Sequence, residues 1–168
     1  DDPASSIDLL KQFPNVVLLR TFSKTHSLAG LRIGYALGSP AFKAAVDAVR
    51  QPFSVNALAQ AAAVEALEHG DSMQRQIETQ IAERVRVEAG VADLGLTATD
   101  SQANFSWISL GENGAEIEDA VVGTLAEAGI VVRAGKLLGG PGWLRVSYGT
   151  REENDRFLAA LGDAVKAH

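Results

Sequence analysis

The feature that most constrains the fold of this sequence is a continuous apolar run over residues 15–21. Its letters, NVVLLRT, are rich in β-branched and aliphatic side chains, and a run of this kind without polar alternation is typical of a strand covered on both faces in a parallel or mixed sheet. A second strand is predicted over residues 31–38, where glycines permit close backbone approach. The loop over residues 22–30 therefore joins two buried strands.

Helices and strands are predicted to interleave along the rest of the chain. Shorter helices are expected over residues 5–13, 40–50, 57–68, 114–128 and 151–167. A long, half-exposed helix is expected from residue 71 or 72 to about residue 94, because apolar side chains recur there at helical spacing. Further strands are predicted over residues 96–99, 104–108, 130–133 and 143–147. We therefore predict an α/β chain whose last part is a compact α+β layer.

The composition excludes several classes of function. The sequence has no cysteine, so disulfides, thiolate nucleophiles and cysteine-based zinc sites are ruled out. The histidines at positions 26, 69 and 168 lack ligand spacing, and no metal site is expected. A formal charge of −6 without a block of Lys or Arg gives no reason to expect a nucleic acid or a membrane as partner. No apolar run approaches the roughly 20 residues that span a bilayer, and no secretion signal opens the chain, so a cytoplasmic protein is expected.

The loop between the first two predicted strands holds a Lys, hydroxyls and an Arg, within FSKTHSLAGLRIGY at residues 22–35. A Lys at a strand end can be desolvated, which lowers the pKa of its amine and makes it a nucleophile toward an aldehyde. Arg32 follows Lys24 by eight positions and carries a planar guanidinium suited to a phosphate. Thr21 and Ser23 add hydroxyl donors. Each residue alone would more commonly be a surface or packing residue, but the joint spacing favours a ligand with an aldehyde and a phosphate at its two ends.

The pattern S-K-x(5)-G-L-R-I-G-Y resembles the cofactor-binding stretch of fold-type I pyridoxal-phosphate aminotransferases. In the form SKTHSLAGLRIGY it is most similar to histidinol-phosphate aminotransferases and the related aromatic amino acid aminotransferases. The resemblance implies that Lys24 holds pyridoxal 5'-phosphate in a Schiff base and that Thr21, Ser23 and Arg32 contact the cofactor phosphate. Three further stretches, at residues 101–105, 129–133 and 144–154, resemble the small domain of the same family, so the resemblance covers nearly the whole chain.

The small-domain resemblance implies two substrate-binding arginines. Arg145 matches the arginine that holds the substrate's anionic group, either an amino acid carboxylate or the phosphate of histidinol phosphate, and a guanidinium can grip either one bidentately. Arg133 matches a second arginine near that group, with a surface strand residue as an equal alternative. Trp107 and Trp143 are interpreted as core aromatics.

The resemblance also implies a division of the chain. Residues 1–56 would end the large cofactor-binding domain, residues 57–95 would form connecting helices, and residues 96–168 would form the small C-terminal domain. The family pattern further requires an Asp at the pyridinium nitrogen, an Asn and a Tyr at the ring oxygen, and an aromatic residue stacked on the ring, all upstream of Lys24, which only 23 residues precede. We therefore expect roughly the C-terminal half of such an enzyme, inactive alone and with uncovered apolar strand faces.

The expected reaction is transamination from histidinol phosphate or an aromatic amino acid to 2-oxoglutarate, in a homodimer with residues of both subunits at each site. Three alternatives stay open. A lyase or decarboxylase of the same fold would differ in substrate orientation. The aminotransferase-like sensor domain of a transcription regulator resembles the motif too, although such domains usually carry a Pro within the stretch at residues 27–30. In a purely structural α/β domain, Lys24 would face solvent and bind nothing.

Overall fold

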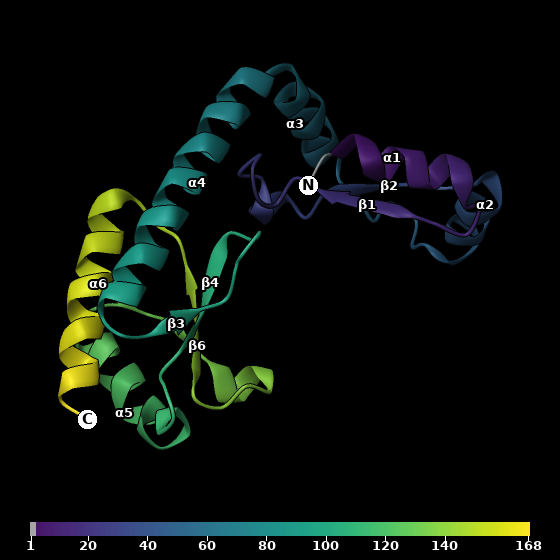
Figure 1. The fold of residues 1–168 in the computed structure, drawn as a ribbon. Coiled ribbons are helices and arrows are strands. Elements are labelled where there is room, and N and C mark those ends of the chain that lie inside the picture. The colour runs from purple at the N-terminus through teal and green to yellow at the C-terminus, as the bar shows by residue number, and fades with distance from the viewer. Residues whose placement is uncertain (1–2) are drawn as a thin grey trace. The chain divides into compact units, whose positions relative to one another are not determined.

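The chain divides into two compact units. A computed structural model describes the backbone of residues 3–168 and the side chains from residue 6 onward. The units are residues 1–76 and 77–168, and their boundary lies inside the longest helix, α4 (Gly70–Asp93). Each unit has a sheet of its own (Figure 1). The division predicted from sequence, after residues 56 and 95, follows the domains of the family and stays a prediction.

The first unit is built on an antiparallel pair of strands. β1 (Leu18–Thr21) pairs with β2 (Gly34–Leu37), and Thr21 lies opposite Gly34. Its helices are α1 (Pro3–Gln12), α2 (Pro40–Val49), α3 (Ala57–Glu68) and the first turns of α4. The side chain of Asn56 caps α3 by accepting a hydrogen bond from the amide of Ala59 at 2.8 Å, which explains why this helix begins where the sequence predicts.

Both strands of the first unit are shorter than predicted. Residues 15–17 lie before β1, and a 3-10 helix, η1 (Ala29–Leu31), replaces the start of the second predicted strand. The second difference has a clear cause, because the φ angle of Arg32 is 53°, a left-handed conformation that a strand does not contain. The prediction of two covered faces is wrong for this chain. Leu19 is 70% exposed and Tyr35 is 46% exposed, since no further strand or layer covers them among the described residues.

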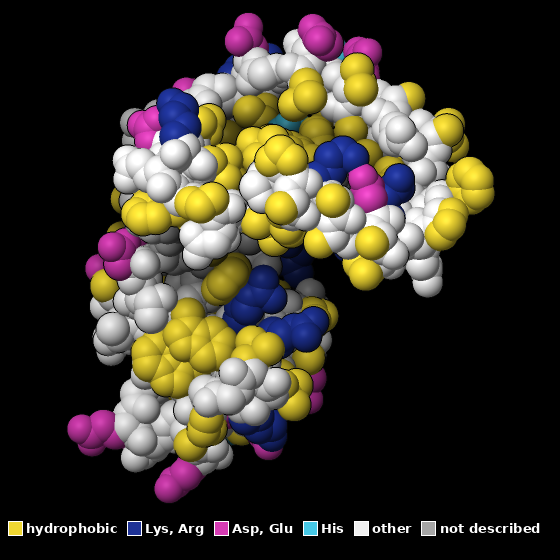
Figure 2. Space-filling model, turned by 90° about the vertical axis from the view of Figure 1, so that its right-hand side faces the viewer, with side chains coloured by type: hydrophobic (Ala, Val, Ile, Leu, Met, Phe, Trp, Pro, Cys, Tyr) yellow, Lys and Arg dark blue, Asp and Glu magenta, His cyan; other side chains and the backbone are white. Residues whose placement is uncertain are grey.

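Large hydrophobic side chains remain exposed across the first unit, as Figure 2 shows for one face. Besides those of the strands, they include Phe53, Leu58, Val64 and Val49. Exposed apolar surface of this extent is typical of a region that another polypeptide segment contacts. The expectation of uncovered apolar strand faces is therefore met in this unit.

The second unit is a four-stranded antiparallel sheet in the order β3-β4-β6-β5. Its strands are β3 (Thr97–Ala98), β4 (Phe105–Ser109), β5 (Arg133–Ala134) and β6 (Trp143–Ser147). Its helices are the rest of α4, α5 (Gly114–Glu127) and α6 (Arg151–Lys166), and a 3-10 helix, η2 (Gly135–Leu138), lies between β5 and β6. The strand predicted over residues 130–133 is reduced to Arg133 and Ala134, because the amide of Ile130 is instead bonded to the Leu125 carbonyl at the end of α5.

The core of the second unit lies between one sheet face and the three helices. Alternate strand residues such as Ile108 and Leu144 are fully buried there against Val91, Leu125 and Leu161 of the helices. Most side chains of the opposite face are only partly buried within this unit. Within the described residues, no helix combines the length and hydrophobicity that crossing a membrane requires.

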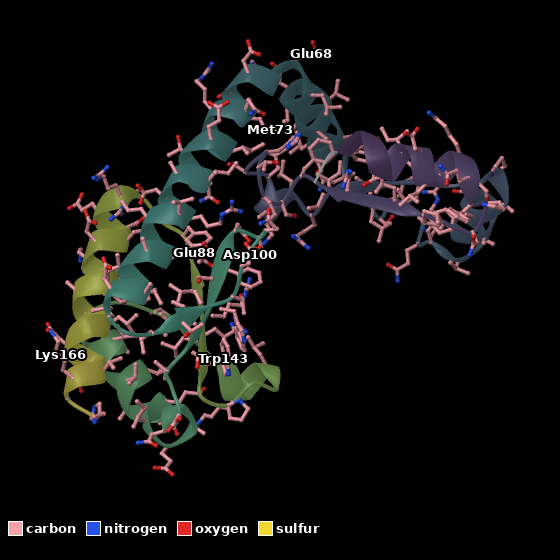
Figure 3. The ribbon with its side chains drawn as sticks, in the orientation of Figure 1. Glu68, Met73, Glu88, Asp100, Trp143 and Lys166 are labelled. Atoms are coloured by element: carbon pink, nitrogen blue, oxygen red, sulfur yellow. The ribbon has the colours of Figure 1, made fainter. Side chains whose placement is uncertain are left out.

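Trp107 and Trp143 lie on the open face of this sheet, so their interpretation as core aromatics is wrong. Their rings stack with centroids 5.9 Å apart, and both residues are partly exposed. In Figure 3, Trp143 lies on the side of the sheet away from Lys166 of α6. The alternation of β4 and β6 decides this placement, because Ile108 and Leu144 occupy the buried positions next to the two tryptophans.

Candidate cofactor and substrate sites

The loop that carries Lys24 is closed by the backbone of Phe22. The Phe22 amide donates to the Ile33 carbonyl at 3.2 Å, and the Phe22 carbonyl accepts from the Leu28 amide at 3.0 Å. The Phe22 ring is buried, with the His26 ring edge-on against it at 4.8 Å between centroids. His26 is thus a packing residue of the loop. Lys24 stands at the start of a tight turn, since its carbonyl accepts from the Ser27 amide at 2.9 Å, and its side chain is exposed.

The four predicted cofactor contacts form a set of available donors. Among the residues that the structure describes, the Lys24 amine and the Ser23 hydroxyl have no hydrogen-bond or ion-pair partner. The Thr21 hydroxyl accepts from the Ser23 amide at 3.0 Å, which leaves its own proton to donate. One arm of the Arg32 guanidinium donates to the Ala29 carbonyl at 2.8 Å and the other N–H groups remain available. An amine, two hydroxyls and a guanidinium without a carboxylate suit a ligand that has an aldehyde and a phosphate.

The backbone around this donor set is restrained. Ser27 and Arg32 are both left-handed, with φ angles of 57° and 53°, a conformation that costs a non-glycine residue about 1 kcal/mol or more. A Cβ atom at Gly34 would lie 2.6 Å from the Arg20 carbonyl oxygen, so the two strands can leave the loop this close together only with glycine there. The loop thus stores strain beside the predicted phosphate-binding residue.

A hollow of about 410 Å³ adjoins this loop but does not include Lys24 or Arg32. It is lined by residues 25–28 and by α3 and α4, and it includes His69 and Glu65, whose side chains form a hydrogen bond at 3.0 Å. The structure therefore describes the donor set on an open surface rather than in a shared cavity, because the two-stranded sheet supplies no wall opposite it. In the described part of the chain, no group of three or more His, Asp or Glu side chains is placed to hold a metal ion.

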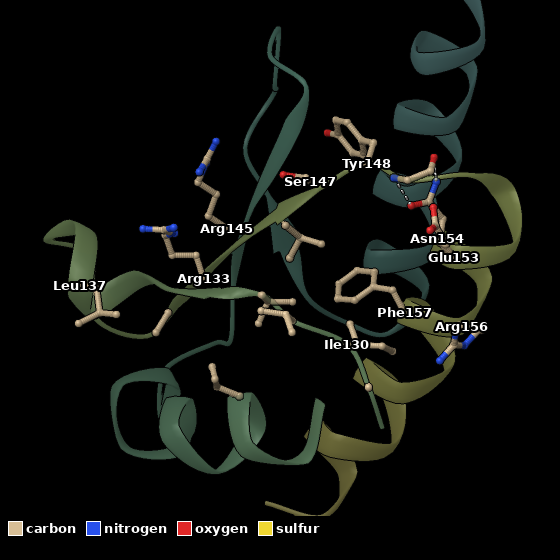
Figure 4. Close-up of a pocket in the computed structure, with 17 residues that line it drawn as sticks. Ile130, Arg133, Leu137, Arg145, Ser147, Tyr148, Glu153, Asn154, Arg156 and Phe157 are labelled. Atoms are coloured by element: carbon tan, nitrogen blue, oxygen red, sulfur yellow. Dashed lines mark hydrogen bonds between the residues drawn. The ribbon is translucent and has the colours of Figure 1, made fainter. Parts of the chain in front are cut away.

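The two predicted substrate arginines lie together in the second unit. Arg133 of β5 stands directly opposite Arg145 of β6, so both side chains project from the same sheet face, as Figure 4 shows. The Arg145 guanidinium lies 4.1 Å from the centroid of the Phe105 ring. Neither arginine has an acidic partner within residues 3–168. Both line a hollow of about 840 Å³ together with Ser147, Tyr148 and Asn154.

Two guanidinium groups on one face, without an acidic partner in the described part of the chain, are suited to binding an anion. Like charges directly opposite each other on neighbouring strands disfavour that pairing, and an anion bound between them would remove the repulsion. Arginine is well suited to a planar carboxylate or a phosphate because its fork of N–H groups matches the spacing of their oxygens.

A buried polar network that the sequence reasoning missed holds the end of β6 beside this site. Asn154 donates to the Glu83 carboxylate at 2.8 Å and accepts from the Gly149 amide at 2.9 Å. The hydrogen bond from Arg86 is the main reason why the pKa of Glu83 lies below its usual range. Tyr148 donates to Glu88 at 3.1 Å, and burial raises the pKa of its phenol. The Tyr148–Glu88 pair lies 60 positions apart and the Asn154–Glu83 pair 71, so no local pattern could have indicated these two contacts.

Known proteins resemble the chain in sequence. The profile of the family described as "Aminotransferase class I and II" matches residues 1–161. An aromatic amino acid aminotransferase of Rhodococcus erythropolis is 42% identical over 156 residues, which are 93% of this chain and 41% of that protein. Histidinol-phosphate aminotransferase 2 of Ralstonia nicotianae is 40% identical over 160 residues, 95% of this chain and 42% of that protein.

A solved structure of the same family resembles the chain in fold. The histidinol-phosphate aminotransferase of Sinorhizobium meliloti, determined in complex with pyridoxal-5'-phosphate, matches with a TM-score of 0.83 at 33% identity. The match covers 92% of this chain and 42% of that one. The chain thus spans 41–42% of the length of the two curated relatives named above.

Proposed function

Because this chain belongs to the class I and II aminotransferases, as the motif around Lys24 predicts, we propose that it supplies the lysine and the phosphate contacts of a pyridoxal-phosphate site. The observation that carries this proposal is the set of available donors between Thr21 and Arg32, which fits the aldehyde and phosphate of that cofactor. When bound, the cofactor withdraws electrons from a substrate amine carbon. The protein residues hold it, orient the substrate and carry protons.

Lys24 has two tasks in this proposal. Its amine would hold the cofactor by condensing with the aldehyde carbon, with release of water, until the substrate amine takes its place. The released amine would then accept the proton from the substrate carbon and donate it again, which is general acid-base catalysis by a positioned group. The exposed position of Lys24 at the start of a turn leaves its side chain free to make both movements.

Thr21, Ser23 and Arg32 bind the cofactor phosphate in this proposal. Two hydroxyls and a guanidinium provide charge-assisted hydrogen bonds to phosphate oxygens, which are stronger than those between neutral groups. The hydrogen bond from the Arg32 guanidinium to the Ala29 carbonyl, together with the restrained backbone, limits the positions of this donor.

Arg145 and Arg133 bind the anionic group of the substrate. We propose transamination with histidinol phosphate or an aromatic amino acid as amino donor and 2-oxoglutarate as acceptor. The names of the two curated relatives support these donors, and an arginine pair accepts either a carboxylate or a phosphate.

The chain spans less than half of its relatives, so we propose that it acts together with the polypeptide that supplies the rest of the fold and is inactive by itself. The exposed apolar surface of the first unit supports this view. From the resemblance alone we further propose a cytoplasmic homodimer. Transamination by the purified 168 residues would contradict the first part, and a monomeric mass of the full-length protein in light scattering would contradict the second.

The covalent role of Lys24 has a direct test. Full-length protein is incubated with pyridoxal phosphate and reduced with borohydride, and peptide mass spectrometry then locates the attached cofactor. We expect the attachment on Lys24 and its loss in Lys24→Ala. Lys43→Ala is the matched control, because Lys43 is an exposed lysine of the same unit that pairs with Asp47 on α2. Attachment that survives in Lys24→Ala overturns the proposal.

A substrate panel on the full-length protein tests the reaction itself. Formation of glutamate from 2-oxoglutarate with histidinol phosphate, phenylalanine or tyrosine is the expected result. Release of carbon dioxide from the donor without glutamate formation would instead show the decarboxylase of the same fold.

A further inference from the structure

The hairpin that carries the two arginines is held by a buried carboxylate on the helix beneath it. Glu118 of α5 is 1% exposed. One of its carboxylate oxygens accepts from the backbone amide of Lys136 at 2.9 Å, and the other accepts from the backbone amide of Gly142 at 2.6 Å. These two amides lie at the two ends of the connection between β5 and β6. A single side chain therefore links the point where β5 ends to the point where β6 begins.

The connection has little freedom apart from this link. The Gly140 amide donates to the Gly135 carbonyl at 2.9 Å, and a Cβ atom on Gly135 would lie 2.2 Å from the Gly140 oxygen. Gly142 has a φ angle of 83°, and a Cβ atom there would lie 2.8 Å from the Ala115 nitrogen. The loop is thus packed tightly on the first turn of α5, where only glycine fits.

The arginine pair needs such a support. β5 is only two residues long, and one of its two cross-strand pairs places Arg133 opposite Arg145. Two like charges in this position oppose the pairing, and the outer edge of β5 has no further strand among the described residues. A carboxylate bonded to amides from both ends of the hairpin favours one register of the two strands, because a shift by one residue would break at least one of the two bonds.

We propose that Glu118 is a positioning residue that sets the register of β5 on β6 and thereby holds Arg133 and Arg145 as one anion site. This inference deepens the proposed function and rests on it for the identity of the site. Glu118 itself touches neither guanidinium in the described structure, since both of its oxygens bond to backbone amides. The sequence carries a signal for this residue. Glu118 lies three and seven positions before the buried Val121 and Leu125, which places all three on the same face of α5.

The test compares Glu118→Gln with Asp119→Asn in this chain. Asp119 is the matched control because it also contacts Lys136, but through an ion pair with the exposed lysine side chain and not through the backbone amide. Two quantities are measured by nuclear magnetic resonance: amide exchange rates of Arg133, Ala134, Leu144 and Arg145, and the dissociation constant for inorganic phosphate from the arginine side-chain Nε–H signals. Urea unfolding is followed in parallel.

We expect Glu118→Gln to speed exchange at the hairpin and to weaken phosphate binding, each on the order of tenfold, because an amide in place of the carboxylate leaves one backbone donor unpaired. Asp119→Asn should change neither. A Glu118→Gln protein that is folded and keeps both values overturns the inference, even if its stability is lower. If Glu118→Gln does not fold, Glu118→Asp replaces it, with the same expectation and the same overturning result.

The two proposals fail differently. If wild-type protein shows no phosphate shift at Arg133 or Arg145 while Glu118→Gln still speeds hairpin exchange, the anion site is wrong and the positioning role stands. If phosphate binds to wild type and to Glu118→Gln equally, with unchanged exchange, the site stands and the positioning role is wrong.

Discussion

Arg133 and Arg145 face each other directly across β5 and β6, and the described residues offer neither of them an acidic partner. The two positive charges would disfavour this arrangement in an isolated sheet. Their placement is therefore consistent with a site whose function is to receive an anion, with part of the binding free energy coming from relief of the repulsion.

Removal of the arginines should affect substrate affinity unequally. Arg145→Ala in the full-length protein should weaken the binding of a substrate carboxylate roughly 10- to 100-fold, because a hydrogen bond to a charged group contributes about 1.5–3 kcal/mol. Arg133→Ala should have a smaller effect, since Arg133 is the more exposed of the two. Lys166→Ala, at the far end of α6, is the control. Isothermal titration with phenylalanine or histidinol phosphate checks this, and equal affinity of wild type and Arg145→Ala would contradict it.

The left-handed backbone of Arg32 predicts that glycine and alanine substitutions at this position differ in stability, although both weaken phosphate binding. Arg32→Gly should be more stable than Arg32→Ala by about 1 kcal/mol, because glycine adopts a positive φ angle without the steric cost of a Cβ atom. Both variants lose the bond to the Ala29 carbonyl, so that loss cancels in the comparison. Both should also lose affinity for pyridoxal phosphate.

The exchange rate of the Leu28 amide, which bonds to the Phe22 carbonyl, reports the local stability of this loop. Slower exchange in Arg32→Gly than in Arg32→Ala is expected. An equal rate in the two variants would show that the strain at this position is negligible.

The turn between β6 and α6 depends on a capping box. The Thr150 hydroxyl accepts from the Glu153 amide at 3.3 Å, and the Glu153 carboxylate accepts from the Thr150 amide at 2.7 Å. Thr150→Ala should lower the free energy of unfolding of the second unit by about 1 kcal/mol. Both tryptophans of the sequence lie in this unit, so urea unfolding followed by tryptophan fluorescence reports on it. Glu153→Gln should be nearly as stable as wild type, because Gln also completes a capping box.

The stability of the second unit should fall in acid for an identifiable reason. The bond from Arg86 holds the pKa of Glu83 below its usual range, so the folded state binds the Glu83 proton more weakly than the unfolded state does. The contribution of Glu83 is therefore fully present above the usual glutamate pKa of about 4.3 and is lost as the pH falls through the lower folded value. The midpoint of urea unfolding, measured between about pH 6 and pH 3, should decrease accordingly.

Glu83→Gln should flatten this acid decrease, while the exposed Glu127→Gln on α5 should leave it unchanged. Part of the decrease should persist in Glu83→Gln, because bonding to the Thr150 amide also lowers the pKa of Glu153. If the midpoint of urea unfolding fell equally with decreasing pH in wild type and Glu83→Gln, the role assigned to Glu83 would be contradicted.

The sequence predicted the order of elements and the family correctly for local reasons. Helices begin and end through contacts between neighbouring residues, as the cap of Asn56 on α3 shows. The motif residues Thr21, Ser23, Lys24 and Arg32 all lie within twelve consecutive positions. The residue pattern over residues 143–147 correctly predicted that Arg145 lies on a strand, β6. Predictions failed where a distant contact or a backbone angle decides the outcome, as at Arg32, whose left-handed conformation ends the second strand early.

What the sequence determined by itself is therefore the family motif and the order of most elements, because both depend on side chains that are close along the chain. Only the tertiary structure decided that Arg133 and Arg145 stand opposite each other, that Trp107 and Trp143 stack on an open face, and that Glu118 bonds to both ends of the hairpin. These relationships depend on strand register and on helix packing, which bring together residues that no local pattern connects.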